Sequence, residues 1–146
     1  MLLSVLQPPH LPAVSYWAPP PLPAMPDITT EADIKTLVDS FYARALADPL
    51  LAPVFIDFAH VDFSHHLPQL YDFWSGILLG TSRYRGFPMR KHFPLPIGLA
   101  HFERWLALFQ ATVEAHFAGP VAEQAKQHAV HVGRVFATRL GLFSQV

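Results

Sequence analysis

The chain has 146 residues, of which 51% are hydrophobic and 14% charged, and its formal net charge is −1. This composition predicts one folded domain with a substantial core and excludes a disordered chain. The charge gives no support to a nucleic-acid or anionic-membrane partner, and the absence of cysteine excludes disulfides, zinc–thiolate sites, iron–sulfur clusters and thiol catalysis. No apolar run approaches the roughly 20 residues that span a bilayer. The first residues, MLLSVL, lack the basic region of a signal peptide, so a cytoplasmic protein is expected.

Proline content divides the chain near residue 27. Eight of the fifteen prolines fall in the first 26 residues, in the run QPPHLPAVSYWAPPPLPAMP. Such a segment cannot form a helix and favours extended polyproline conformation. Residues 1–26 are therefore expected to be a loose tail, and residues 27–146 the folded domain. Two alternatives are left open: the tail recruits a proline-recognising partner, or translation begins at Met25.

The domain is predicted to begin with an amphipathic helix. Thr30 followed by Asp33 resembles a capping box, in which the two residues satisfy each other's backbone N–H groups. Asp48 and Pro49 are expected to end the helix, and a short stretch around Phe55 follows. The apolar residues at helical spacing are Ile34, Val38, Phe41, Tyr42 and Ala45.

A second helix is predicted where apolar residues again recur every three or four positions, and Gly80 is expected to end it. Because proline lacks a backbone N–H, Pro68 is tolerated best in the first helical turn. His66 is therefore expected at or just before the helix start, where its side chain can swing. The alternative is a histidine that simply faces water, as His65 is expected to do. The stripe consists of His66, Leu70, Phe73, Trp74 and Ile77.

The next segment, TSRYRGFPMRKHFPLP, is predicted to be irregular, with one helical turn from Pro88 to Phe93. A long irregular connection often indicates function in a compact domain. Two further helices follow, separated by Gly119 and Pro120. Their apolar stripes are Phe102, Trp105, Leu106, Phe109, Thr112 and Val113, then Ala125, His128, Val132, Val135, Phe136 and Leu140. Strand alternation is absent, so the predicted class is all-α.

His92 lies in the middle of this irregular segment, close to four of the chain's ten basic residues: Arg83, Arg85, Arg90 and Lys91. A neutral imidazole is the usual protein ligand of haem iron in oxygen-handling proteins. A basic cluster beside it would neutralise the two haem propionates, although a solvated basic loop explains the charges equally well. Met89 and Phe93 could pack on the porphyrin face.

Four motifs follow one another in the chain: FYARALADPLLAPVF, HLPQLYDFWSGILLG, YRGFPMRKHFPLPI and HFERWLALFQATV. In this order they closely resemble the group III truncated haemoglobins of bacteria, over about residues 30–140. The resemblance implies a truncated globin fold, a two-over-two helical sandwich whose proximal segment is largely loop. It also implies haem b (iron protoporphyrin IX) as the cofactor. The proline-rich tail is a departure that this family does not need.

The resemblance also implies roles for individual residues. His92 matches the proximal histidine on the iron, and Trp74 matches a structural tryptophan. On the distal side Tyr42, His66 and Trp105 would stabilise the ligand, with His66 at the gate. Which of the basic residues contacts a propionate is left open, with Arg85 and Lys91 as the candidates. The residues expected to pack around the haem are Phe41, Phe55, Leu70, Met89 and Phe93.

Dioxygen bound to ferrous haem gains partial negative charge, so donors aimed at it stabilise the complex. Each such hydrogen bond contributes about 1 kcal/mol, and two or three would slow ligand escape by an order of magnitude or more. Slow release favours chemistry on NO or peroxide, with an unidentified reductase, over bulk transport. CO would bind at the same position.

Several alternatives remain at this point. Within the haem proteins they are an oxygen store or carrier and a gas sensor. Outside them they are a helical protein-interaction module without haem and a non-haem metal protein built on His128 and His131. The expected assembly is a monomer or a weak dimer.

Overall fold

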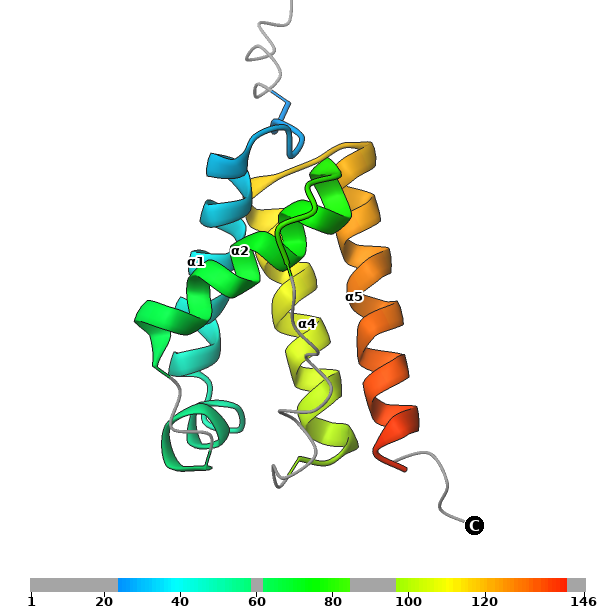
Figure 1. Ribbon diagram of the computed structural model, residues 1–146. Helices are drawn as coiled ribbons and strands as arrows, with labels where there is room; N and C mark the ends of the chain where they lie inside the picture. Colours follow the sequence, from blue (N-terminus) through cyan, green and yellow to red (C-terminus); the bar gives the residue numbers. More distant parts are fainter. Residues whose placement is uncertain (1–23, 59–61, 85–96, 142–146) are drawn as a thin grey trace, which may run out of the picture.

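The computed structural model describes residues 24–58, 62–84 and 97–141, and within these ranges every regular element is helical (Figure 1). In chain order the elements are α1 (Glu31–Ala47), the π-helical turn η1 (Val54–Phe58), α2 (Phe63–Leu79), α4 (Leu99–His116) and α5 (Pro120–Arg139). The predicted all-α class is confirmed. Most of the predicted tail and the single turn from Pro88 to Phe93 lie outside the described residues, so both stay predictions.

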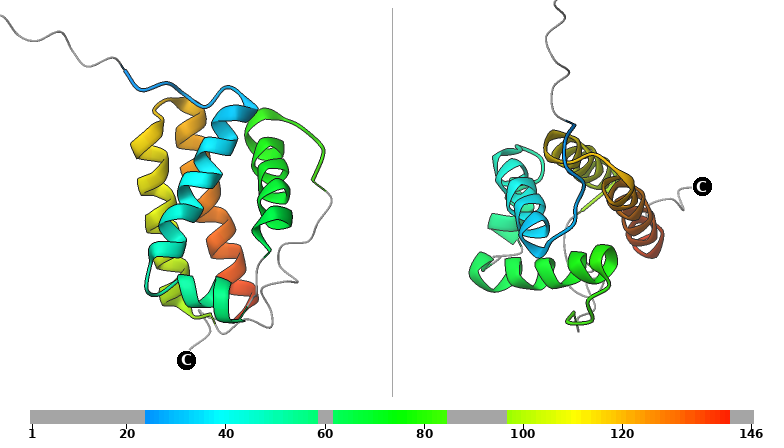
Figure 2. Two further views of the ribbon diagram at one scale, coloured as in Figure 1. Left: turned by 90° about the vertical axis from the view of Figure 1, so that its left-hand side faces the viewer. Right: turned by 90° about the horizontal axis from the view of Figure 1, so that it is seen from above.

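The four long helices form two pairs. Helix α2 crosses α1 obliquely, whereas α4 and α5 run antiparallel to each other (Figure 1 and Figure 2). Helix α1 also packs against α4, so it joins the two pairs around a common core. The largest side chains with almost no exposed surface include Ile28, Ile34, Leu37, Phe109 and Val113. This arrangement agrees with the predicted two-over-two sandwich.

Helix α1 begins and ends as the sequence predicts. The hydroxyl of Thr30 accepts the N–H of Asp33 at 3.2 Å, and the Asp33 carboxylate accepts the N–H of Thr30 at 3.0 Å. The helix ends before Asp48, whose carboxylate accepts the N–H groups of Leu50 and Leu51 at 2.9 and 3.1 Å. The buried face of α1 consists of Ile34, Leu37, Val38, Phe41, Tyr42 and Ala45.

Helix α2 begins earlier than predicted. Its first residue is Phe63, and the carboxylate of Asp62 caps it by accepting the N–H of Ser64 at 3.1 Å. Pro68 therefore lies inside the helix, and His66 lies within the first turn rather than before it. The expectation that Pro68 marks the first turn is wrong. Pro68 removes only one helical hydrogen bond, the one to the Ser64 carbonyl, and the cap and the packed apolar face compensate for it.

Two glycines mark helix boundaries where the sequence predicts them. Gly80 adopts a left-handed conformation with φ 76° and ends α2. Gly119 adopts φ 140° and immediately precedes α5, whose first residue is Pro120. A proline fits this first helical position because its missing N–H would have no helical partner there.

The N-terminus of α5 is capped from a distant part of the chain. Gly119 has no side chain to do so, and the carboxylate of Asp27 instead accepts the N–H groups of Val121 at 3.0 Å and Ala122 at 2.8 Å. A third N–H, from Ile28, reaches the same carboxylate at 2.8 Å. Burial raises the pKa of Asp27, but these donors outweigh burial and lower the pKa below its usual value. The chain before α1 is thereby tied to the start of α5.

Candidate functional site

Two predicted site residues, Tyr42 on α1 and His66 on α2, are in direct contact. The phenol oxygen of Tyr42 lies 3.1 Å from Nε2 of His66, and the two rings meet edge to face with centroids 5.6 Å apart. Tyr42 is buried, and desolvation raises the pKa of its hydroxyl far above the ordinary value. The phenol therefore stays protonated and keeps its O–H available for a hydrogen bond.

A set of aromatic rings, which we call the aromatic cluster, holds the Tyr42 side chain in place. Phe41, Phe55 and Phe63 meet its ring edge to face, with centroid distances of 5.2, 5.5 and 5.7 Å. This edge-to-face geometry is the arrangement that aromatic quadrupoles favour. Phe41 and Phe55 were predicted site residues. Phe63 was missed because Pro68 was taken to mark the helix start, which placed Phe63 outside α2.

Trp105 joins the same cluster from α4. Its ring meets Phe41 edge to face at 6.0 Å and stacks on Phe109 at 5.6 Å. Gly133 on α5 faces the indole, since a Cβ atom there would lie 3.7 Å from the ring. The structure thus brings Tyr42 and His66 together directly and places Trp105 beside them through Phe41.

Leu70 lies one helical turn after His66 on α2 and packs against the core while keeping part of its surface accessible. Five other predicted site residues lie outside the part of the chain that the structure describes. They are the proposed iron ligand His92, the packing residues Met89 and Phe93, and the basic residues Arg85 and Lys91.

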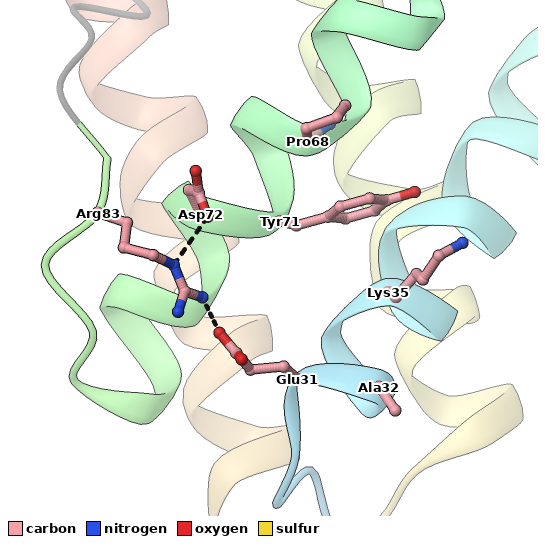
Figure 3. Close-up of a pocket in the computed structure, with 7 residues that line it drawn as sticks. All are labelled: Glu31, Ala32, Lys35, Pro68, Tyr71, Asp72 and Arg83. Atoms are coloured by element: carbon pink, nitrogen blue, oxygen red, sulfur yellow. Dashed lines mark hydrogen bonds and ion pairs between the residues drawn. The ribbon is translucent and has the colours of Figure 1, made fainter.

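Arg83, the first member of the predicted basic cluster, is engaged with acidic residues. Its guanidinium pairs with the carboxylate of Glu31 on α1 and with that of Asp72 on α2, the latter at 3.1 Å (Figure 3). It also donates to the hydroxyl of Ser75 at 3.3 Å. Arg83 therefore joins α1 to α2, and two negative charges already compensate its positive charge. No local pattern in the sequence signals this pairing, because Glu31 and Arg83 are far apart in the chain.

These residues belong to a surface groove of about 380 Å³ between α1 and α2 (Figure 3). The groove does not include Tyr42, His66 or Trp105, so it is separate from the aromatic cluster. Its lining residues are Glu31, Ala32, Lys35, Pro68, Tyr71, Asp72 and Arg83.

The residues around the Tyr42–His66 pair suit a haem. A porphyrin is a flat apolar disc, and it needs apolar surface to cover together with a few polar groups directed at its iron site. Several large apolar side chains of α2, α4 and α5 are only half-buried: Leu70, Phe73, Ile77, Phe102, Trp105 and Phe136. The neighbouring polar groups are a phenol, an imidazole and an indole, rather than the carboxylates that a hard cation prefers.

The alternative of a non-haem metal site gains no support. The rings of His128 and His131 lie 6.3 Å apart on α5. Within residues 24–58, 62–84 and 97–141, no group of three or more histidine, aspartate or glutamate side chains could hold a metal ion.

Comparison with known proteins decides the family. Residues 26–138 match the bacterial-like globin family. The chain belongs to this family. A group 3 truncated haemoglobin of Campylobacter jejuni is 33% identical to this globin over 87 residues, which are 57% of this chain and 68% of that protein. The predicted relationship to the group III truncated haemoglobins is thereby confirmed.

The solved structures agree with this assignment. The crystal structure of group III truncated haemoglobin from Campylobacter jejuni matches this globin with a TM-score of 0.73 and 26% identity, over 82% of this chain and 97% of that one. The predicted globin fold is confirmed, and membership of the family implies a haem cofactor and small gas ligands. In the part of the globin that the structure describes, no helix is both long and apolar enough to span a membrane.

Proposed function

We propose that this globin holds haem b and binds dioxygen for chemistry on NO or peroxide rather than for bulk transport. The observation that carries the proposal is the hydrogen bond between the buried phenol of Tyr42 and the imidazole of His66. A buried polar pair of this kind lowers stability unless both partners are satisfied.

Several residues would hold the cofactor. His92 is the proposed iron ligand, and Arg85 and Lys91 are the proposed propionate partners. When bound, the haem supplies an iron site that takes a diatomic ligand. The proposed packing residues are Phe41, Phe55, Leu70, Met89 and Phe93.

The chain itself contributes hydrogen-bond donors that point at that ligand. His66 can donate from Nε2 to the Tyr42 oxygen, and the phenol proton of Tyr42 is then free to point at the ligand. Trp105 adds an indole N–H from α4. Such donors strengthen one another when they form a chain in a site that excludes water.

These hydrogen bonds favour retention over release. Each bond contributes about 1 kcal/mol, and a difference of about 1.4 kcal/mol is tenfold in an equilibrium constant. A globin with two or three donors releases oxygen slowly, which suits it to reactions in the pocket. Turnover would then require electrons from a reductase or a small reductant.

The test is a ligand-dissociation measurement on the haem-loaded protein. Tyr42→Phe keeps the ring and its aromatic contacts but removes the donor, so oxygen release should become about fivefold faster, the factor that corresponds to about 1 kcal/mol. Tyr71→Phe serves as the control, because it removes a phenol hydroxyl that donates to Asp39 and does not contact the Tyr42–His66 pair. An unchanged rate in Tyr42→Phe would contradict the proposed role of Tyr42.

The proximal side is tested by absorption spectroscopy of the oxidised, reduced and CO-bound protein. His92→Ala should lose haem affinity and the spectrum of histidine ligation. Unaltered haem uptake with an unaltered histidine signature would overturn the assignment of His92.

A further inference from the structure

Two indoles stack on one phenyl ring in the core. The ring of Phe109 stacks on Trp105 at 5.6 Å with an interplanar angle of 20°, and on Trp74 at 4.7 Å with an angle of 23°. Trp105 belongs to the aromatic cluster around Tyr42 through its contact with Phe41. Trp74, in contrast, is almost fully buried in α2. Phe109 thus connects the candidate site to an indole on a different helix.

From Trp74 the ring contacts continue outward. Phe73 meets Trp74 edge to face at 5.5 Å, and it meets Tyr84 edge to face at 5.2 Å. Tyr84 follows α2 and keeps part of its side chain accessible to solvent. An unbroken series of ring contacts therefore runs from Trp105 through Phe109, Trp74 and Phe73 to Tyr84. We call this series the aromatic chain.

The order of residue types in the aromatic chain matters chemically. Indole and phenol side chains give up an electron at accessible potentials, whereas a phenyl ring does not. Electron tunnelling also falls steeply with distance, so rings in van der Waals contact form efficient bridges. Trp105, Trp74 and Tyr84 can therefore each carry an oxidising equivalent, while Phe109 and Phe73 bridge the gaps between them.

We propose that the aromatic chain conducts electrons from Tyr84 to the haem pocket during peroxide reduction, so that Tyr84 is an oxidation site for small one-electron donors such as phenols or ascorbate. The inference rests on the proposed function, because it needs peroxide to react in the pocket. The proposal adds a solvent-accessible oxidation site at Tyr84 to the ligand site in the haem pocket.

The reaction balances over two one-electron transfers along the aromatic chain. Hydrogen peroxide takes up two electrons and two protons, its O–O bond breaks, and two water molecules form. In each transfer Tyr84 donates one electron to the aromatic chain and releases its phenolic proton to solvent. The resulting tyrosyl radical takes a hydrogen atom from the phenol or ascorbate, which leaves as a one-electron-oxidised product.

Tyr71 provides a comparison within the same helix. It is also partly accessible, but its hydroxyl donates to the carboxylate of Asp39, and Lys35 lies 5.5 Å from its ring centroid. Among the residues that the structure describes, no aromatic ring contact joins Tyr71 to Trp74. General surface oxidation would affect both tyrosines, whereas conduction through the aromatic chain would favour Tyr84.

The experiment treats the haem-loaded full chain with one equivalent of hydrogen peroxide and a nitroso spin trap, and then measures trapped tyrosines by peptide mass spectrometry. We expect several-fold more adduct on Tyr84 than on Tyr71. Trp74→Phe should reduce the Tyr84 adduct several-fold, whereas the control Trp17→Phe, which removes an indole from the predicted tail, should not. Tyr84→Phe should instead increase oxidation of Trp74.

Two results would overturn the inference: equal labelling of Tyr84 and Tyr71, or Tyr84 labelling that is unchanged in Trp74→Phe. If Trp74→Phe does not fold, Tyr84→Phe decides, because an unoxidised Trp74 in that variant contradicts conduction. Haem uptake and CO binding are measured on the same samples. Normal binding with unselective labelling removes only this inference, whereas absent haem uptake removes the proposed function as well.

Discussion

Replacement of Asp27 by asparagine should destabilise the globin through the start of a helix that is remote in sequence. In the native protein Oδ2 of Asp27 accepts the N–H of Val121, and Oδ1 accepts those of Ala122 and Ile28. An asparagine side chain has one oxygen and one NH₂ group, and the latter cannot accept. At least one N–H at the start of α5 therefore loses its partner, and a negative charge is removed from the helix N-terminus.

The magnitude follows from these two losses. A lost N-terminal cap costs about 1 kcal/mol, and the favourable interaction of a carboxylate with the helix dipole contributes about 0.5 kcal/mol more. The sum of about 1.5 kcal/mol corresponds to a decrease in Tm of about 6 °C for a domain of this size. The partial exposure of the Asp27 side chain keeps the dipole contribution small, because solvent screens it.

Thermal unfolding followed by circular dichroism at several pH values is the assay. Because the pKa of Asp27 in the native protein is below its ordinary value of 3.8, the stabilisation is fully present above that pH and is lost as the pH falls through the lower native value. The difference between wild type and Asp27→Asn should thus be constant near neutrality and shrink in acid. Glu123→Gln, which removes another carboxylate from the first turn of α5, is the control and should change Tm little. Equal Tm values for wild type and Asp27→Asn at pH 7 would refute the reasoning.

Three further predictions use the same structure. Gly119→Ala should cost about 2 kcal/mol or more, because φ 140° strains any other residue and a Cβ atom would lie 2.6 Å from the Asp27 carboxyl carbon; urea unfolding measures the loss. Asp48→Ala should cost about 2 kcal/mol in the same assay, since it removes one buried and one partly buried hydrogen bond and the ion pair with Arg104 at 3.4 Å. His66→Leu should speed oxygen release less than Tyr42→Phe in stopped-flow measurements; an equal or larger effect would make His66 the principal donor.

Local signals predicted most of the secondary structure. The capping box at Thr30 and Asp33, the left-handed Gly80 and the proline at position 120 act within a few residues of the boundaries that they set. Helix α2 is the exception. Its start was misplaced because the rule for proline considers one lost hydrogen bond, whereas the Asp62 cap and the packing of the helix decide the outcome.

Contacts between distant parts of the chain could not be predicted from the sequence. The cap that Asp27 provides to α5, and the pairing of Arg83 with Glu31, join residues that no periodicity relates. Trp105 and Phe109 were predicted to share a stripe, but the stacking of Phe109 on Trp74 depends on how α2 and α4 are arranged in space. Of the candidate site, the structure shows the contact between Tyr42 and His66, and the roles of these two residues stay predictions. The role of His92 stays a prediction.

The proline inside α2 has a consequence for how His66 behaves. The Ser64 carbonyl receives no helical N–H from residue 68, so the turn between Asp62 and Pro68 is joined to the rest of the helix by fewer bonds than an ordinary turn. Such a turn opens at a lower free-energy cost than the turns that follow it. Native-state hydrogen exchange should therefore find the amides of His65 and His66 among the fastest of α2. The imidazole beside Tyr42 thus sits on the part of its helix that fluctuates most easily.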